Sequence, residues 1–389
     1  MLSFENTEIA FKSKSDQELN TAYRLFKLVG KPWMVKLGRK FTNLALKLRL
    51  PITGIVKKTI FKQFCGGENI QECSSKIDEL GKFGIGTILD YSVEGKISDE
   101  AFEATCNEII ETVNRANNNK DIPFAVFKIT GISRFGLLEK VNNPNAELSQ
   151  EERKEFAEVH QRVDKICRRA YETGTPVFID AEDSWIQDAI DRLADAMMAR
   201  YNKEKAIVYN TIQLYRHDRL QFLKDSYVKA EQGNYFLGVK LVRGAYMEKE
   251  AERAEKMGYE NPIHKTKAAT DKDYNLALEF CIQNIKKIAI CAGTHNEDSS
   301  KLLAELIEKN GLDKNNPHLY FAQLLGMSDH ISYNLSNAEF NVAKYVPYGP
   351  VKEVLPYLIR RAEENTSVAG QTSRELNLLI KERNRRKGK

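Results

Sequence analysis

The sequence lacks several patterns that would place a chain in a functional class at once. It has six cysteines but no Cys-x-x-Cys pair, and Cys65 and Cys73 have no second pair of ligands nearby. We therefore predict no zinc site. No set of carboxylates and histidines has the spacing of metal ligands, which argues against metal-dependent hydrolysis. A Gly-x-Ser-x-Gly sequence is also absent, which excludes a hydrolase built on that turn.

Long apolar runs and an export signal are missing as well. No stretch approaches the roughly 18 uninterrupted apolar residues of a membrane-spanning helix, so we expect no transmembrane segment. The opening sequence MLSFENTEIAFKSKSD has no charged region followed by an apolar one, as a secretory signal would have. Unpaired cysteines suit a reducing compartment. We predict a cytoplasmic protein, either free or peripheral on the inner face of the cytoplasmic membrane.

The charge that is present is unevenly distributed. The 389 residues carry a formal net charge of +5, yet the first 63 hold about nine more basic than acidic residues. This basic arm contains no nucleic-acid-binding module, so we expect no nucleic-acid partner. Its segments Thr21–Trp33 and Leu44–Leu50 mix aliphatic, aromatic and cationic residues at helical spacing. Peripheral membrane contact and a helical arm packed on the main domain are both open interpretations.

The hydrophobic pattern changes near residue 80. Residues 1–80 have a mostly helical pattern, whereas the rest alternates short β-rich runs with charged helical stretches. Eight such runs fit one (βα)8 barrel, an α/β fold of the TIM type with an N-terminal helical extension. A doubly wound sheet is the alternative, but Tyr91-Ser-Val-Glu-Gly95 lacks its glycine-rich phosphate turn. The predicted domains are 1–80 and 81–389, and the runs are Thr87–Tyr91, Phe124–Thr130, Pro176–Glu182, Ala206–Gln213, Gly238–Arg243, Lys287–His295, His318–Leu325 and Asn341–Pro347.

Polar residues cluster where these runs end. In a barrel of this kind the active site lies at the carboxyl ends of the strands. Each residue alone can be explained without a functional site, for example as an exposed side chain or a helix cap. Together, however, they predict one cationic rim. Such a rim suits an anionic ligand that carries a carboxylate and phosphates. The residues are Lys128, Asp180, Glu182, Gln213, Lys240, Arg243, Tyr246, Thr294, His295, Asn296, Tyr345 and Tyr348.

The last run leads into a pair of adjacent arginines. Tyr345–Gly349 is expected to end a strand, and Arg360 and Arg361 follow on a helix, with Glu364 one turn further on. Two neighbouring guanidiniums repel each other on a surface helix, whereas each can bind a small carboxylate as a fork. Glu364 can hold one arginine in place. By itself this cluster is more typical of a solvated helix face, so the prediction of a carboxylate site depends on the rim.

Taken together, five ordered motifs resemble the proline dehydrogenase family, over about residues 85–385 and in its monofunctional, mitochondrial type. The motifs are Lys240-Leu-Val-Arg-Gly-Ala-Tyr-Met247, Thr294-His-Asn-Glu-Asp298, Phe321-Ala-Gln-Leu-Leu-Gly-Met327, Tyr345-Val-Pro-Tyr-Gly349 and Tyr357-Leu-Ile-Arg-Arg-Ala-Glu-Glu-Asn365. The resemblance implies a barrel that holds FAD at its mouth. It also implies oxidation of L-proline to Δ1-pyrroline-5-carboxylate, with electrons passed to a membrane quinone, and functional coupling to pyrroline-5-carboxylate dehydrogenase.

The resemblance also implies roles for the site residues. Lys128, Arg360 and Arg361 would clamp the proline carboxylate. Tyr246 and Tyr345 would wall the ring, with Asp180 in the polar network beneath it. Around the flavin it implies Gln213, Lys240, Arg243, Gly244, Thr294, His295 and Asn296, with Glu364 paired to a clamp arginine. Many bacterial members have arginine at position 240 and lysine at 243, the reverse of this chain.

Two other functions are considered beside this one. The first is hydroxyproline oxidation in the same barrel, against which the bulk of Tyr345 beside the substrate ring argues. The second is a flavin-free basic adaptor that binds membranes or nucleic acid through residues 20–63. For proline oxidation the sequence offers no obvious base, so we expect solvent to take the proton of the ring amine.

Overall fold

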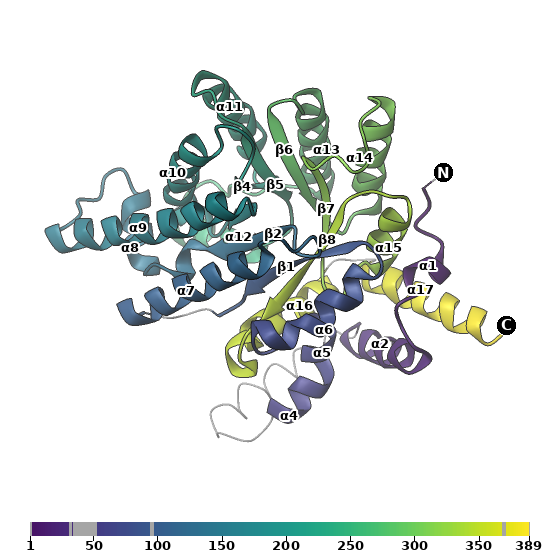
Figure 1. The fold of residues 1–389 in the computed structure, drawn as a ribbon. Helices are drawn as coiled ribbons and strands as arrows, with labels where there is room; N and C mark the ends of the chain where they lie inside the picture. The colour runs from purple at the N-terminus through teal and green to yellow at the C-terminus, as the bar shows by residue number, and fades with distance from the viewer. Residues whose placement is uncertain (1, 31–32, 34–52, 94–96, 368–370, 389) are drawn as a thin grey trace. The chain divides into compact units, whose positions relative to one another are not determined.

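The computed structural model describes residues 2–30, 33, 53–93, 97–367 and 371–388 (Figure 1). The chain forms two compact units: unit 1 is Met1–Val93 with Gln323–Lys389, and unit 2 is Glu94–Ala322. The predicted amphipathic segment Leu44–Leu50 lies outside the described residues. The two units follow spatial packing, so they do not test the predicted division at residue 80.

Eight parallel strands form a closed barrel in the order β1 to β8, so the predicted (βα)8 fold is confirmed. Each strand is a short apolar run, as expected for parallel strands that are covered on both faces. In register, Lys128 pairs with Asp180 and Ile88 with Tyr345. The strands are β1 (Ile85–Tyr91), β2 (Phe124–Lys128), β3 (Val177–Asp180), β4 (Val208–Gln213), β5 (Leu237–Val242), β6 (Ile288–Gly293), β7 (Leu319–Leu324) and β8 (Val342–Tyr348).

Helices follow the strands and also precede β1. Several begin at side-chain caps: Ser15 and Ser149 each form a capping box with the glutamate three residues on. In unit 1 the helices are α1 (Thr7–Ala10), α2 (Asp16–Val29), α4 (Thr53–Val56), the π-helical turn η1 (Lys57–Phe61), α5 (Lys62–Phe64), α6 (Ile70–Gly81), α15 (Asp329–Asn337), α16 (Val351–Ser367) and α17 (Gln371–Arg386). In unit 2 they are α7 (Asp99–Ala116), the 3-10 turn η2 (Ile129–Gly131), α8 (Phe135–Asn142), α9 (Gln150–Thr173), α10 (Ser184–Tyr201), α11 (Arg219–Gln232), α12 (Met247–Met257), α13 (Lys267–Gln283) and α14 (Glu297–Lys309).

Aromatic side chains from β2, β3, β4 and β7 pack together in unit 2. The rings of Phe124 and Phe178 stack with centroids 4.4 Å apart, and Tyr209 meets both edge-on at 5.6 and 5.3 Å. Tyr320 contacts Phe124 in the same edge-on manner at 4.8 Å. Offset and edge-on pairs of this kind add to the burial energy of the rings. All four rings stand at the first or second position of their strands, so they form an apolar layer near the strand starts.

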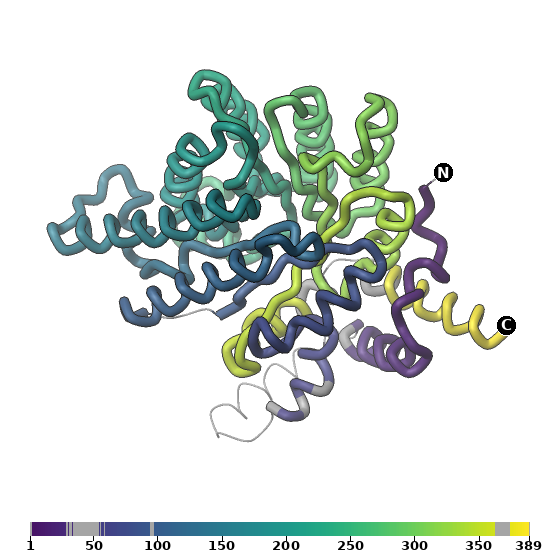
Figure 2. Tube along the Cα trace, viewed as in Figure 1, coloured from purple at the N-terminus to yellow at the C-terminus, as the bar shows by residue number. Residues whose placement is uncertain are grey.

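The two ends of the chain pack against each other within unit 1 (Figure 2). Leu19, Ala22 and Phe26 of α2 are buried with Leu378 and Leu379 of α17. The apolar face of α2 in the predicted basic arm is therefore buried, which agrees with the interpretation of a packed helical arm. Leu28 and Trp33 remain exposed, so membrane contact stays a prediction for the other face.

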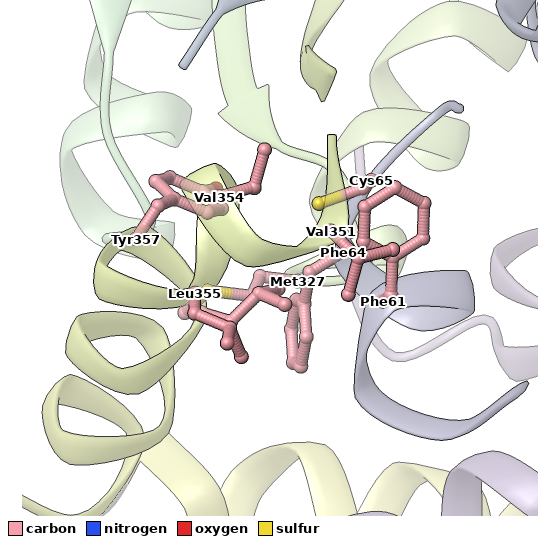
Figure 3. Packing of buried hydrophobic residues seen from close by; sticks show 9 residues of the cluster. Phe61, Phe64, Cys65, Met327, Val351, Val354, Leu355 and Tyr357 are labelled. Atoms are coloured by element: carbon pink, nitrogen blue, oxygen red, sulfur yellow. The ribbon is translucent and has the colours of Figure 1, made fainter. Parts of the chain in front are cut away.

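A second apolar cluster in unit 1 holds the helix that carries the arginine pair (Figure 3). Phe61 and Phe64, from η1 and α5, pack with Val354, Leu355 and Leu358 of α16, and the cluster also contains Cys65, Met327, Val351 and Tyr357. The backbone becomes extended at Cys65, where α5 ends. Residues 61–65 therefore fix the first turns of α16.

A buried charge cluster, which we name the Asp329 cluster, links four parts of unit 1. The Asp329 carboxylate lies 2.8 Å from the Lys344 ammonium of β8 and 3.1 Å from that of Lys14. Lys344 also donates to the Met327 carbonyl at 2.8 Å, and the Ser328 amide donates to the Glu375 carboxylate of α17. Burial raises the pKa of Asp329, but the two ammoniums outweigh it and hold this pKa well below its usual range.

Two features are absent from the described residues, a membrane-spanning helix and a cluster of metal ligands. None of the helices within those ranges is long and apolar enough to span a bilayer. No group of three or more His, Cys, Asp or Glu side chains in the same ranges has the arrangement to hold a metal ion.

Candidate active site at the strand ends

An ion pair between β3 and β5 forms the floor of the rim in unit 2. The Lys240 ammonium donates to the Asp180 carboxylate and lies 5.3 Å from the centroid of the Phe178 ring. Lys240 is buried and Asp180 is half-buried. Lys128 is half-buried beside Asp180 in register. The structure thus brings three of the predicted residues together, and it pairs Asp180 with Lys240.

Glu182 lies just past the end of β3 and is buried, with 6% of its surface exposed. Its carboxylate accepts the Thr130 amide at 3.0 Å and the Thr130 hydroxyl. Burial raises the pKa of Glu182 to about 7, although the Thr130 hydrogen bonds and the Lys128 charge act in the opposite direction. The rim therefore contains a carboxyl group that titrates near neutral pH.

The Gln213 side chain at the end of β4 has a fixed orientation. Its Nε2 donates to the Glu182 carbonyl at 2.6 Å and to the Tyr215 hydroxyl at 2.8 Å. A carbonyl only accepts, so this contact assigns the amide nitrogen and, with it, the oxygen. Oε1 is buried and has no donor among the residues that the structure describes. A buried acceptor of this kind calls for a ligand N–H or O–H group.

Arg243, directly after β5, is held by its neighbours in unit 2. Its guanidinium donates to Asp271 at 2.5 Å, to Ser299 at 2.6 Å and to Thr294 at 3.1 Å, and it stacks 3.9 Å from the Tyr274 ring centroid. Burial lowers the Arg243 pKa, and Tyr274 and Asp271 counter that effect. Arg243 and Thr294, two of the predicted site residues, are thus in direct contact.

The residues after β6 begin a helix. The Asn296 side chain accepts the Ser299 amide at 2.9 Å and caps α14. The Asn296 amide in turn donates to the Thr294 hydroxyl at 3.1 Å. His295, between them, is half-buried. These contacts order the predicted 294–296 segment and give Asn296 a structural role that the resemblance did not include.

The turn between β5 and α12 contains two left-handed residues. Gly244 has φ +84° and open space where a side chain would stand, so the backbone is accessible to a ligand at this point. Tyr246 is the residue directly before α12 and has φ 54°, a conformation that is uncommon for a bulky residue. Strained backbone of this kind clusters at functional sites, which agrees with the predicted position of Tyr246 in a site.

The remaining predicted residues belong to unit 1. Tyr345 is buried in β8, and the chain passes through Gly349, with φ +144°, into α16. Arg360 and Arg361 are half-buried on this helix, and the Arg361 guanidinium lies 5.2 Å from the Tyr357 ring centroid. The expected order of strand, turn and helix is confirmed. Glu364 lies in α16, but its side chain falls outside the described residues.

The roles of two polar residues at the rim were not predicted from the sequence. Glu182 was noted at the end of its run but received no role, and Thr130 was taken only as the end of another run. Their hydrogen bonds join segments 52 residues apart, which local patterns do not reveal. One signal for a role of Glu182 was available in the sequence. It is a second acidic residue, two positions after Asp180, at the end of the same strand.

Comparison with known proteins gives consistent matches. A family model described as proline dehydrogenase matches residues 73–374. Proline dehydrogenase 1, mitochondrial, from Dictyostelium discoideum is 37% identical, over 98% of this chain and 74% of that protein. Proline dehydrogenase 2, mitochondrial, from Arabidopsis thaliana is 36% identical, over 85% of this chain and 79% of that protein.

Among solved structures, proline utilization A from Bdellovibrio bacteriovorus, inactivated by N-propargylglycine, superposes with a TM-score of 0.73 at 20% identity. The match covers 97% of this chain and 42% of that protein, so the chain spans about two fifths of its length. At this identity the likeness carries the fold alone.

The comparisons also correct one prediction. Both sequence relatives are named as mitochondrial, so the predicted cytoplasmic location is wrong and the relatives point to mitochondria. The free cysteines are compatible with either compartment. The family match over residues 73–374 and the two sequence relatives together establish that this chain belongs to the proline dehydrogenase family.

Proposed function

We propose that this enzyme oxidises L-proline to Δ1-pyrroline-5-carboxylate with FAD as its cofactor and a membrane quinone as the electron acceptor. Membership of the family supports proline oxidation in proline catabolism. One observation supports FAD as the cofactor. The Oε1 atom of Gln213 is buried and accepts no hydrogen bond from the described residues, and the same rim carries the cations Lys128, Lys240 and Arg243. An acceptor aimed from a cationic rim suits a flavin, which has an N–H group and two phosphates.

Substrate binding is assigned to three cations and two tyrosines. Lys128, Arg360 and Arg361 would clamp the carboxylate of proline, because guanidinium forks and an ammonium form charge-assisted hydrogen bonds with it. Tyr246 and Tyr345 would wall the ring. Asp180, which holds the Lys240 ammonium, would keep that charge fixed beneath them.

The cofactor residues fit FAD by their donor and acceptor chemistry. Gln213 would accept from the flavin ring, and Lys240 would stabilise negative charge on it. Arg243, Gly244, Thr294, His295 and Asn296 would follow the ribityl and phosphate portions, and Glu364 would pair with a clamp arginine. When bound, FAD would supply the oxidation by accepting a hydride from C5 of proline. The residues of the chain orient the substrate, while solvent takes the amine proton.

Contact with a membrane would bring the enzyme to its quinone. The exposed Leu28 and Trp33 lie near the basic residue Lys27 in the N-terminal arm, which is the composition of an interfacial segment. Vesicles of anionic lipid should therefore sediment the wild-type enzyme, and a variant with Leu28→Ser and Trp33→Ser should stay in solution. Functional coupling to pyrroline-5-carboxylate dehydrogenase remains part of the proposal.

The absorbance spectrum of the purified enzyme tests the cofactor. We expect the usual flavin bands, which should bleach when L-proline is added without oxygen and return when a soluble quinone is added. A colourless protein that stays inactive after incubation with FAD would reject the proposal. Turnover on 4-hydroxyproline should be much lower than on proline, since Tyr345 limits the space beside the ring.

Substitution of a clamp residue tests substrate binding. Arg361→Met should raise the KM for proline at least tenfold, because a charge-assisted hydrogen bond contributes about 1.5–3 kcal/mol. Arg153→Met, at an exposed position of α9, is the matched control and should leave KM unchanged. An unchanged KM in the Arg361 variant would remove the clamp role.

A further inference from the structure

Glu182 is the point at which three strand ends of unit 2 are joined. It follows β3, its carboxylate binds Thr130 after β2, and its carbonyl binds Gln213 at the end of β4. With 6% of its surface exposed, it has little room to contact a ligand directly.

The carboxylate fixes the segment that carries Lys128. Thr130 donates both its amide, at 3.0 Å, and its hydroxyl to Glu182. Both donors lie in the single tight turn η2, which begins one residue after Lys128. Because that turn leaves little freedom between positions 128 and 130, holding Thr130 also holds the backbone of Lys128.

The main chain of Glu182 is itself anchored in the interior. Its amide donates to the Gln187 side chain at 2.7 Å, and Gln187 donates to Asp191 at 2.9 Å. Asp191 also accepts from Asn210 of β4 at 2.9 Å and from Arg219 of α11 at 2.7 Å. Every member of this chain of hydrogen bonds is buried. Satisfied buried networks rigidify the elements that they join.

We propose that Glu182 is a positioning residue for proline oxidation: its carboxylate sets the position of Lys128 and its carbonyl sets the orientation of the Gln213 amide. One residue then couples the substrate clamp to the cofactor contact. The inference rests on the proposed function, which supplies the roles of Lys128 and Gln213. Errors of about 1 Å in such groups are enough to lower catalytic efficiency strongly.

A competing role for the same carboxyl group is acceptance of the substrate amine proton through the Thr130 hydroxyl. The charged groups that act on Glu182 are Lys128 of β2 and Asp183 beside it. The two roles differ in what glutamine does at this position. A glutamine can accept the Thr130 amide with its oxygen and donate to the Thr130 hydroxyl with its nitrogen, so it preserves position. It cannot take up a proton at neutral pH.

The experiment compares Glu182→Ala with Glu182→Gln in the FAD-loaded enzyme. Binding is measured by calorimetry with cyclopentanecarboxylate, a five-membered ring with a carboxylate and no amine to oxidise. We expect Glu182→Ala to raise both the Kd of this probe and the KM for proline about tenfold, and Glu182→Gln to stay within about threefold of wild type. In a Lys128→Met background, Glu182→Ala should not raise the Kd of the probe further, because the side chain that Glu182 positions is already absent.

Two controls separate position from folding. Glu382→Gln alters a buried glutamate of α17 outside the site, and Thr112→Val removes a buried hydroxyl of α7. Both should leave the Kd unchanged. If Glu182→Ala does not fold, Thr130→Val tests the same contact, with an expected rise in Kd of about threefold.

Three results would overturn the inference. A wild-type Kd in both Glu182→Ala and Thr130→Val would remove the positioning role. Equal loss of kcat in the Ala and Gln variants with an unchanged Kd would identify a proton acceptor instead. Additive effects of Glu182→Ala and Lys128→Met would uncouple the two residues. Failure of the proposed function looks different, because wild-type protein would then lack flavin bands or would not respond to proline.

Discussion

Two buried carboxylates, one in each unit, show opposite electrostatic behaviour. Glu182 in unit 2 accepts hydrogen bonds from the neutral amide and hydroxyl of Thr130. Asp329 in unit 1 lies within 3.1 Å of two ammonium groups, those of Lys344 and Lys14. Their exposed surface is the same, 6% each. The pKa of Glu182 is raised to about 7, whereas that of Asp329 is lowered.

Equal burial thus accompanies opposite pKa shifts, so burial alone does not decide whether a carboxyl group is charged near neutral pH. Desolvation disfavours the charged form at both positions. At Glu182 the neutral Thr130 donors and the Lys128 charge offset only part of this cost, while two close cations outweigh it at Asp329. The carboxyl group with the raised pKa therefore lies on the candidate rim, and the one with the lowered pKa lies in the Asp329 cluster.

The largest expected effect comes from breaking the Asp329 cluster. Asp329→Asn leaves two ammonium groups without their counter-charge, and removing one partner of a buried pair typically costs about 3–5 kcal/mol. We expect a fall of that size in the free energy of unfolding by urea. Adding Lys344→Met to this variant should restore part of the loss. Wild-type stability in the single variant would mean that the cluster is electrostatically neutral for folding.

The next largest effect is the pH dependence that Glu182 gives to the free energy of unfolding. Between about pH 4.5 and 7 the folded protein keeps a proton on Glu182 that the unfolded chain has lost. This group therefore makes stability fall as pH rises through that window. Glu182→Gln should remove the fall, so its stability relative to wild type should improve by about 1–3 kcal/mol between pH 5 and 8. Unfolding midpoints across this range measure it, and a constant difference would contradict it.

Asp329 should respond at the other end of the pH scale. Because its folded pKa is lowered, its contribution is present above the pKa of the unfolded aspartate and is lost only as pH falls through the folded value. The Asp329→Asn variant should therefore lie closest to wild type in strong acid. A difference that stays constant from neutral pH to acid would show that charge is not the cause.

A smaller effect should follow from removal of the second cation. Lys14 keeps a fifth of its side chain exposed, and Lys344 would still neutralise Asp329 in its absence. Lys14→Met should therefore cost about 1 kcal/mol, nearer to a surface pair than to a buried one. A loss as large as that of Asp329→Asn would make Lys14 the principal partner.

The smallest effect is expected at an exposed pair on α14. Lys301 lies 3.8 Å from Glu305, and more than half of each side chain is exposed. Such pairs contribute about 0.3–0.5 kcal/mol, so Lys301→Met should shift the unfolding midpoint only slightly. This variant is the baseline for the buried ones, and a large shift would show that the comparison measures something other than burial.

The barrel could be predicted from the sequence because its strands are short apolar runs between amphipathic helices. All eight runs overlap the observed strands, but five of them extend past the strand end, to Thr130, Glu182, Arg243, His295 and Leu325. The types of residue do not show where the last ladder hydrogen bond is made. The overshoot matters, because the residues past each strand end belong to loops that form the rim.

The candidate site could be predicted only as a set of strand ends. Which side chains meet depends on the register of strands far apart in the chain, as with Lys240 and Asp180, 60 residues apart. The resemblance supplied the family, which excludes a non-enzymatic adaptor, but it did not assign Glu182. Nothing in the composition distinguished a mitochondrial location from a cytoplasmic one.

The pairing of α2 with α17 has a consequence for synthesis of the chain. Helix α2 leaves the ribosome long before its partner, and at about 5–20 residues per second the delay reaches tens of seconds. During that time Leu19 and Phe26 have no cover from Leu378 and Leu379. The nascent chain should depend on chaperones until translation ends, and a premature stop codon in the last helix should yield a protein that aggregates.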